Sequence, residues 1–208
     1  MLLYLAVASG LLQALGYIFY LRGVLHHGIT PNPTTWLMFA YGTFLLGVLE
    51  YSRGAEWELL LLPAICAILS VVVALICWKR GTLRWPKGWE NRTVFIADIL
   101  LTIGYCGAWA FVTYGLVSES ERALTNLVFL ICSNLTTLTA FTPLTLEAKR
   151  NPKGEQILPW TIWTSAYAVL GIATYLEHGW GTELMIYPVL NAVLHASVAW
   201  LVRNRQSK

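Results

Sequence analysis

Apolar residues fill most of this chain in long runs that short polar stretches separate. Seven of these runs approach or reach the length that a helix needs to cross a bilayer, about 20 apolar residues. They lie at residues 3–21, 33–51, 57–78, 93–117, 124–146, 157–177 and 181–202. Too few residues remain outside the runs to form a separate soluble domain. The pattern therefore predicts an all-α membrane protein with seven transmembrane helices.

Two of the polar breaks share a design. In Gly16–Trp36, Arg22 and two histidines follow an apolar run, and Pro33 opens the next run. In Pro143–Trp163, a charged turn separates two runs, and Pro159 falls in the first turn of the second run, where proline is tolerated. This turn holds charged side chains that cannot remain in hydrocarbon, namely Glu147, Lys149, Arg150, Lys153 and Glu155. The repeated corner indicates a duplicated unit.

The second half of the chain repeats features of the first at a spacing of 127 residues. The matching pairs are Trp36 with Trp163, Glu50 with Glu177, Gly54 with Gly181, and Glu56 with Glu183. Because a three-helix unit has an odd number of spans, one further helix is needed to give both units the same orientation. We therefore predict a 3+1+3 architecture of parallel repeats. Its parts are a first three-helix repeat at 1–80, a linker loop and inverter helix at 81–122, and a second repeat at 123–208.

Charge predicts how the helices cross the membrane. Charged residues make up 12% of the chain, against about 25% in soluble domains. Of the 14 Lys and Arg residues, all but Arg53 and Arg122 fall on alternate loops of one side, including the loop from Lys79 to Arg92. By the positive-inside rule the N-terminus is outside and the C-terminus cytoplasmic, which suits a plasma membrane or a bacterial inner membrane. Topology explains these basic loops, so we expect no nucleic-acid partner.

Several kinds of chemistry lack their motifs in this sequence. There is no Gly-rich phosphate loop, no His-Glu-x-x-His and no Gly-x-Ser-x-Gly. The four cysteines lie within predicted helices without metal-ligand spacing. A retinal Schiff base would need a lysine within the last helix, and that run has none. We expect no enzymatic activity, no cofactor and no metal.

Polar side chains recur near the middle of several predicted helices. They include Gln13, Tyr41, Thr43, Asn134, Tyr167 and Asn191, and His195 lies on the same helix face as Asn191. Unpaired polar groups cost free energy in hydrocarbon, so these side chains should face the bundle interior or a cavity. Two hypotheses follow. The residues form hydrogen bonds that hold helices together, or they form a shared layer that binds a solute.

Asp98 is the one acid well inside a predicted helix. An ionisable residue at such a depth is a candidate for function, here proton coupling. A structural ion pair with Arg84 or Arg92 is the alternative, because Asp98 lies only about one and a half turns from Arg92.

The two corners and the N-out, C-in order of two three-helix units resemble the PQ-loop superfamily, which includes the SWEET sugar transporters. The resemblance implies hinges for alternating access at prolines of the first two helices of each unit. Pro143 matches this pattern, and Gly16 stands where the first unit should have a proline. Pro33 and Pro159 complete the set of hinge candidates. The glutamine that follows the family's proline is missing after Pro143.

The resemblance also implies residues that bind the solute. In the superfamily an asparagine on the third helix of each unit lines the central pocket. Asn191 matches it, whereas Cys66 stands at about the equivalent place in the first unit. Trp160-x-x-Trp163 is similar to a tryptophan pair in the nicotinamide riboside transporters, which share the three-one-three layout. Trp163 therefore joins the midspan polar residues as a candidate solute contact.

These observations predict a SWEET-like transporter or facilitator for a small polar solute. The solute and the lipid bilayer are its expected partners, and a homo-oligomer stays open. The alternative is a membrane protein of PQ-loop fold that does not transport, such as a receptor, a sorting factor or an assembly subunit. A wet midplane cavity closed at one end favours transport. A bundle packed solid favours a structural role.

Overall fold

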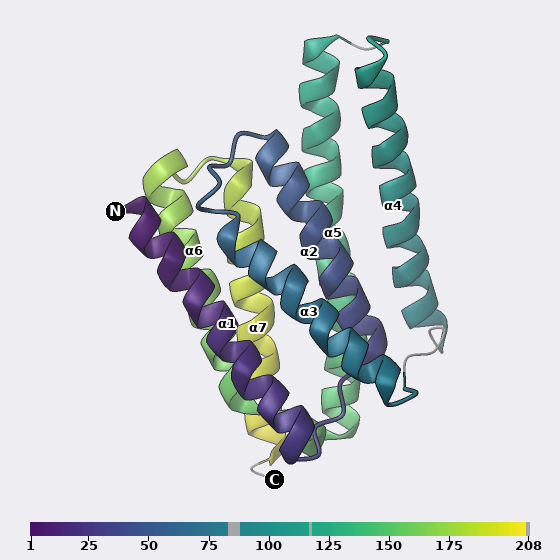
Figure 1. Ribbon diagram of the computed structural model, residues 1–208, viewed down its shortest axis with the longest axis vertical. Coiled ribbons are helices and arrows are strands. Elements are labelled where there is room, and N and C mark those ends of the chain that lie inside the picture. Colours follow the sequence, from purple (N-terminus) through teal and green to yellow (C-terminus); the bar gives the residue numbers. More distant parts are fainter. Residues whose placement is uncertain (83–87, 117, 207–208) are drawn as a thin grey trace.

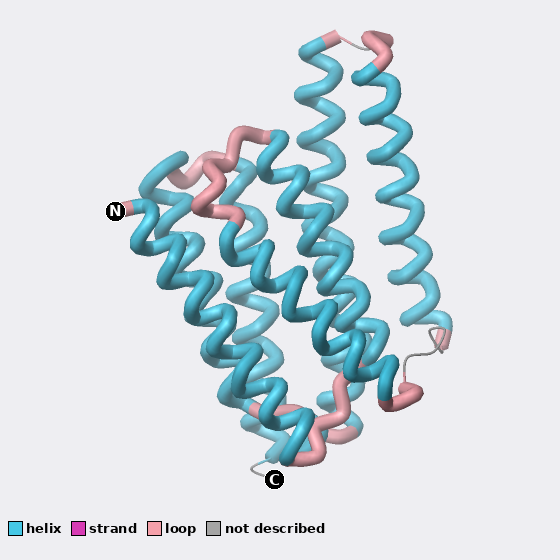
Figure 2. Tube along the Cα trace, viewed as in Figure 1, coloured by secondary structure: helices cyan, strands magenta, loops and turns pink. Residues whose placement is uncertain are grey.

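The computed structural model describes residues 1–82, 88–116 and 118–206, and all of the regular secondary structure in these residues is helical. The helices are α1 (Leu2–His26), α2 (Pro33–Ser52), α3 (Leu61–Lys79), α4 (Trp89–Thr113), α5 (Glu119–Arg150), η1 (Pro152–Gly154), α6 (Ile157–His178), η2 (Glu183–Met185) and α7 (Ile186–Gln206). Each predicted apolar run corresponds to one α-helix, and short loops join the helices (Figure 2). Arg84 and Lys87 of the basic loop lie outside the described residues.

Six helices are long and apolar enough to cross a membrane: α1, α3, α4, α5, α6 and α7. This composition is that of an integral membrane protein. Helix α2 has 20 residues and is not among the six. Its run contains Thr34, Thr35, Thr43 and Glu50, and these polar residues lower its mean hydropathy.

Capping residues explain two of the helix starts. The side chain of Asn32 accepts hydrogen bonds from the backbone N–H groups of Thr34 and Thr35, and Pro33 follows as the first helical residue. Ser118 and Glu121 form a reciprocal capping box at the start of α5. This helix therefore begins before the apolar run that predicted it and continues to Arg150.

The helices are arranged so that α3 packs on both α1 and α2, while α7 packs on both α5 and α6 (Figure 1). These contacts define two helix groups, α1–α3 and α5–α7. Between the two groups, α1 packs on α6 and α2 packs on α5. We call the end of the bundle that holds Met1 and the α2–α3 and α6–α7 turns the N-terminal end. The opposite end, with the α1–α2 and α5–α6 turns and Gln206, is the C-terminal end.

Helix α4 lies at the edge of the bundle. It packs mainly on α5 and less on α2, and with the first turns of α5 it projects beyond the other helices (Figure 1, upper right). Only 11% of the residues in its apolar stretch are buried, against 33–44% in the other five apolar helices. Its exposed side chains include Ile99, Leu100, Ile103 and Phe111. A helix with this surface suits contact with lipid tails.

Two buried clusters fill the bundle, one toward each end. The aromatic cluster, toward the C-terminal end, contains Tyr17, Tyr20, Trp36, Phe39, Phe141, Trp160 and Trp163. The leucine cluster, toward the N-terminal end, contains Leu45, Leu46, Leu49, Leu59, Leu62, Leu130 and Leu170. Buried polar side chains lie where the two clusters meet, and they form the candidate site.

Candidate functional site

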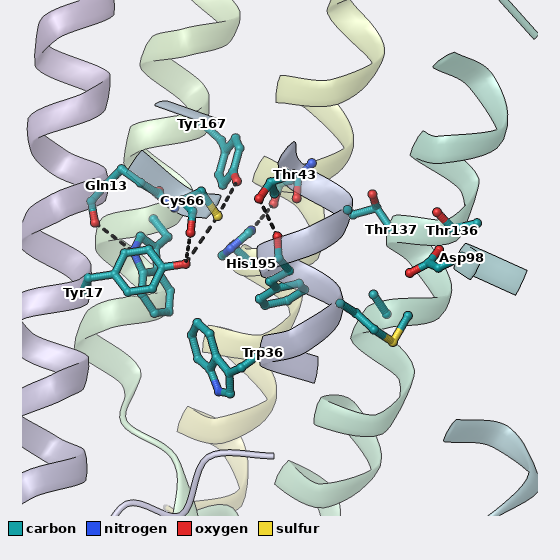
Figure 3. Close-up of a pocket in the computed structure, with 16 residues that line it drawn as sticks. Gln13, Tyr17, Trp36, Thr43, Cys66, Asp98, Thr136, Thr137, Tyr167 and His195 are labelled. Carbon is teal, nitrogen blue, oxygen red and sulfur yellow. Dashed lines mark hydrogen bonds between the residues drawn. The ribbon is translucent and has the colours of Figure 1, made fainter. Parts of the chain in front are cut away.

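A small cavity lies in the middle of the bundle, and all seven α-helices contribute to its lining (Figure 3). Most of the residues singled out from the sequence meet there. They are Gln13 on α1, Asp98 on α4, Trp163 and Tyr167 on α6, and Asn191 and His195 on α7. The polar side chains that lie far apart in the sequence thus form one layer in space.

Two of the candidate residues are not part of this lining. Tyr41 instead lies beside Phe95 and Asp98 in a separate pocket of about 340 Å³ between α2 and α4. Asn134 is buried, and its Nδ2 donates a hydrogen bond to the Leu130 carbonyl oxygen of its own helix, at 2.9 Å. Their positions provide no direct contact with the cavity.

A hydrogen-bond network on one side of the cavity joins four helices, α1, α3, α6 and α7. The hydroxyl of Tyr17 lies 2.6 Å from Oγ of Ser70 and 3.3 Å from Sγ of Cys66. The hydroxyl of Tyr167 approaches the same sulfur at 4.0 Å and lies 3.1 Å from the hydroxyl of Tyr187. Cys66 therefore stands between tyrosines of α1 and α6, and it lines the cavity.

His195 sits among aromatic rings with one nitrogen engaged. Its Nδ1 lies 2.7 Å from the carbonyl oxygen of Asn191. A carbonyl oxygen only accepts, so Nδ1 carries the hydrogen and the neutral ring keeps a lone pair on Nε2. The ring centroid lies 5.0 Å from that of Phe141, 5.5 Å from Trp160 and 4.8 Å from Tyr167.

The position of Trp163 depends on a glycine. Its Nε1–H donates to the carbonyl oxygen of Gln13 at 3.1 Å, and its ring lies against Gly16. A Cβ at Gly16 would stand 2.6 Å from Cδ1 of Trp163, closer than side chains tolerate. Gly16, one of the predicted hinge positions, provides the space for the indole.

The proline candidates occupy different positions in their helices. Pro33 is the first residue of α2, and Pro159 is the third residue of α6, so neither interrupts a helical hydrogen bond. Pro143 lies inside α5 and removes one backbone hydrogen bond there. Of the three, it is placed to let its helix bend.

The cavity is small in this conformation. Its volume for water-sized spheres is about 20 Å³, which is room for about one water molecule. Four buried polar atoms of the described residues have no hydrogen-bond partner, and two of them belong to side chains of the cavity lining, Oε1 of Gln13 and Nε1 of Trp36; the other two are Oγ1 of Thr35 and Oδ1 of Asn134. Gln13 is only 1% exposed and lines the cavity. Unpaired buried groups are rare in folded proteins, and a ligand or water often satisfies them.

Asp98 lies at the α4 side of the cavity, buried to 5% exposure. Figure 3 places its carboxyl group beside Thr136 of α5. The ion pairs of the described residues include Arg53–Glu183 and His178–Glu56, and Arg84 lies outside those residues, so the pairing of Asp98 with Arg84 or Arg92 stays a prediction. No group of three His, Cys, Asp or Glu side chains in the described part of the chain is close enough to hold a metal ion.

An ion pair and a contact between a histidine and a carboxyl group lie at the N-terminal end of the junction between α1–α3 and α5–α7. Arg53, at the end of α2, donates from Nε to Oε1 of Glu183 at 2.8 Å, and its Nη2 bonds the same oxygen. Nε2 of His178, at the end of α6, lies 2.8 Å from Oε2 of Glu56. Glu56 and Glu183 occupy equivalent positions in the predicted repeats, and each contacts a basic residue of the other helix group.

A buried carboxyl group closes the C-terminal end. Glu155, in the turn before α6, is only 4% exposed although the sequence predicted a solvated charged turn. Its Oε1 accepts from the Tyr20 hydroxyl at 3.3 Å, and its Oε2 accepts from Nε1 of Trp160 at 3.1 Å. Burial raises the pKa of Glu155 to about 8. The hydrogen bonds from Trp160 and Tyr20 lower the pKa and offset only part of this rise.

Comparison with known proteins finds no match for this chain. No family model matches the chain, and neither does a curated protein nor a solved structure.

Proposed function

We propose that this chain is a SWEET-like transporter or facilitator that moves a small polar solute by alternating access. The observation that carries this proposal is the buried polar cavity at the junction of two helix groups, with contacts between the groups closing both of its ends. A carrier that exposes its site to one side at a time needs a central site and a separable closure at each end.

The packing of the helices supports two equivalent units. If α1, α2 and α3 are exchanged with α5, α6 and α7, the contacts of α3 with α1 and α2 become those of α7 with α5 and α6. The contact of α1 with α6 becomes that of α5 with α2. This exchange is what the predicted repeats at 1–80 and 123–208 require. Peripheral α4 then serves as the inverter between parallel units, with the N-terminal end outside.

Movement of one unit against the other would open the cavity. The present conformation is closed at both ends and has room for about one water molecule, so a solute binds only after the units separate. Pro143 lies near the C-terminal end of α5 and faces the buried side of the helix. We assign it the role of the flexible point through which α5 bends as that end opens.

The small cavity also favours the second candidate, a PQ-loop-like receptor or assembly protein that does not transport. In that case the polar layer only holds the helices together. Hydrogen bonds between membrane helices contribute about 0.6 kcal/mol on average, rarely more than about 1.7 kcal/mol. The two candidates therefore differ in what the loss of one cavity side chain does.

Asn191→Ala separates these candidates. Asn191 lines the cavity and donates a hydrogen bond only to the Tyr187 carbonyl oxygen of its own helix, at 3.0 Å. Purified protein in liposomes is offered a mixed metabolite pool, and the internal solutes are identified by mass spectrometry. A solute site predicts that Asn191→Ala weakens binding by about 1–3 kcal/mol and leaves the melting temperature nearly unchanged.

Ser197→Ala is the matched control. Ser197 lies on the same helix and its hydroxyl also donates to a carbonyl oxygen of that helix, that of Val193, but the side chain is exposed. It should retain normal uptake. Normal uptake by a destabilised Asn191→Ala protein would remove the proposed site. Absence of uptake by the unmodified protein, relative to empty liposomes, would favour the receptor or assembly role.

A further inference from the structure

A buried carboxyl group lies near the N-terminal end of the junction between the two helix groups. Glu50 belongs to the last turn of α2 and is only 5% exposed. Its backbone carbonyl oxygen accepts from the N–H groups of Arg53 and Ala55, but its carboxyl group forms no hydrogen bond or ion pair with the other described residues. Glu177, which the repeat spacing pairs with Glu50, is exposed. The burial of this acid is therefore not shared by the second unit.

The position of Glu50 is between the outer ion pair and the cavity. Arg53, one turn further along α2, pairs with Glu183 across the junction. Tyr187 lies one turn after Glu183 and is close enough to Glu50 to interact with it electrostatically. The hydroxyl of Tyr187 lies 3.1 Å from that of Tyr167, which lines the cavity. Opening of the N-terminal end, which separates Arg53 from Glu183, would therefore bring water to Glu50.

The surroundings of Glu50 favour a neutral acid. The titratable side chains around this end of α2 are Arg53, Glu56, Arg122, His178, Glu183 and Tyr187. Arg53 bonds Glu183, His178 contacts Glu56, and Arg122 has another partner. At this depth α3 contributes apolar side chains of the leucine cluster, such as Leu62. A buried carboxylate without a cation is costly, and such a group keeps a proton instead.

We propose that Glu50 is a proton-binding site that makes opening of the N-terminal end depend on pH. While that end is closed, the carboxyl group keeps its proton. When the end opens and water reaches the group, the O–H bond breaks, its electron pair stays on the oxygen, and the proton passes to water or a buffer base. Closing takes up one proton again. This inference rests on the proposed function, because it concerns access to that same site.

The direction of the pH effect follows from the two states of the acid. A carboxyl group in water ionises above about pH 4.3, whereas the buried group stays neutral. The closed state thus holds a proton that the open state releases. The closed state has its full advantage below about pH 4.3 and loses it as the pH rises. One proton changes the opening equilibrium by at most about tenfold per pH unit.

Cys66 is a natural reporter of opening. Its side chain lines the cavity and is 4% exposed in the closed conformation. Purified protein in detergent is treated with a dilute, water-soluble sulfonated maleimide at several values between about pH 5 and 8, and mass spectrometry of the peptides measures modification of Cys66. With dilute reagent the rate of modification follows the open fraction.

Glu50→Gln keeps the size of the side chain and cannot release a proton. We expect the Cys66 labelling rate of the unmodified protein, divided by that of Glu50→Gln, to rise at least about threefold between about pH 5 and 8. The effects of pH on the thiol and on the C-terminal end are common to both proteins and cancel in this ratio. Glu50→Asp should keep the rise. If Glu50→Gln does not fold, Glu50→Met, an apolar side chain of similar length, takes its place.

Glu177→Gln is the matched control. Glu177 occupies the equivalent position in the predicted second repeat and is exposed, so opening hardly changes its contact with water. This variant should be labelled like the unmodified protein at every pH. Loss of the pH effect in Glu177→Gln as well would assign it to exposed acids and overturn the inference.

Two further results would overturn the proton site. One is a ratio that stays constant or falls as the pH rises, because Glu50 would then titrate alike in the open and closed states. The other is absence of Cys66 labelling at every pH, because the N-terminal end would then not open. Uptake in liposomes tests transport separately. Uptake with a constant ratio would overturn the proton site and leave transport standing. A rising ratio without uptake of any solute would uphold the proton site and count against transport.

Discussion

The two ends of the junction between α1–α3 and α5–α7 are closed by different forces. At the N-terminal end the side chains of Arg53 and Glu183 are 22% and 27% exposed, so solvent and salt reach their ion pair. At the C-terminal end Glu155 is 4% exposed, and its partners Tyr20 and Trp160 are fully buried. Exposed ion pairs contribute about 0–1 kcal/mol. The burial of aromatic rings and hydrogen-bonded polar groups contributes more.

This difference indicates which closure gives way first. Breaking the Arg53–Glu183 pair returns two charged groups to water, which solvates them well. Opening the C-terminal end would hydrate Glu155 and expose the rings of Tyr20, Trp36 and Trp160, which belong to the aromatic cluster. We therefore expect the N-terminal end to open more readily. Three predictions test the comparison.

The largest expected effect is a dependence of stability on pH at the C-terminal closure. The pKa of Glu155 rises from 4.5 to about 8 on folding, so the folded state holds a proton that the unfolded state releases. The stabilisation is complete below about pH 4.5 and is lost as the pH rises through about 8. Its slope is at most about 1.4 kcal/mol per pH unit.

The measurement is a set of denaturation curves between pH 5 and about 8 for the unmodified protein and for Glu155→Gln. A glutamine does not titrate, so the difference in unfolding free energy between the two proteins isolates Glu155. That difference should shrink as the pH rises. A difference that is constant, or that grows with pH, would show that Glu155 titrates as an exposed acid does.

The second prediction removes the carboxyl group altogether. Glu155→Ala leaves the Tyr20 hydroxyl and the Trp160 Nε1–H without their acceptor in a buried place. We expect the unfolding free energy to fall by about 1–3 kcal/mol. Glu155→Gln keeps an acceptor oxygen and should lose less. Glu147→Ala, a partly exposed acid near the end of α5, serves as control and should change little. Equal losses for both alanine variants would remove the special role of the buried acid.

The accuracy of the sequence predictions depends on the surroundings of each helix. Runs of apolar residues predicted seven helices, because the bilayer requires apolar side chains of about that length. Midspan polar residues such as Gln13, Asn191 and His195 were predicted to face inward, because hydrocarbon does not solvate them. The structure confirms the helices and brings these three side chains to one cavity.

The aromatic residues of the site were harder to identify. In a membrane helix both the lipid face and the interior face are apolar, so periodicity does not separate them. Tyr17 lines the cavity while Tyr4 of the same helix is 80% exposed. Trp36 and Trp163 are buried, yet Trp200 is exposed. The repeat, which pairs Trp36 with Trp163, marked those two tryptophans, and the spacing Trp160-x-x-Trp163 marked Trp163 a second time.

Glu155 shows a second limit of the sequence. A turn that contains Asn151, Pro152 and several charges predicts exposure to solvent. In the structure η1 folds this turn back onto the bundle, and Nε2 of Gln206 donates to the carbonyl oxygens of Pro152 and Glu155 at 2.9 and 3.0 Å. Contacts between the turn and the distant end of α7 therefore bury the acid, and local sequence does not encode such contacts.

The smallest expected effect is at the N-terminal closure, and salt distinguishes it from the C-terminal one. Arg53 bonds Glu183 through Nε and Nη2 and also donates from Nη1 to the Ala123 carbonyl oxygen at 3.1 Å. A double-mutant cycle with Arg53→Gln and Glu183→Gln separates the ion pair from the carbonyl contact. We expect a coupling free energy of about 0.2–1 kcal/mol at low salt. Screening should remove most of it between about 0.1 M and 1 M salt, whereas the loss in Glu155→Ala should stay the same. A coupling that salt leaves unchanged would mean that the N-terminal pair is as well shielded as the buried acid. The expectation that this end opens first would then fail.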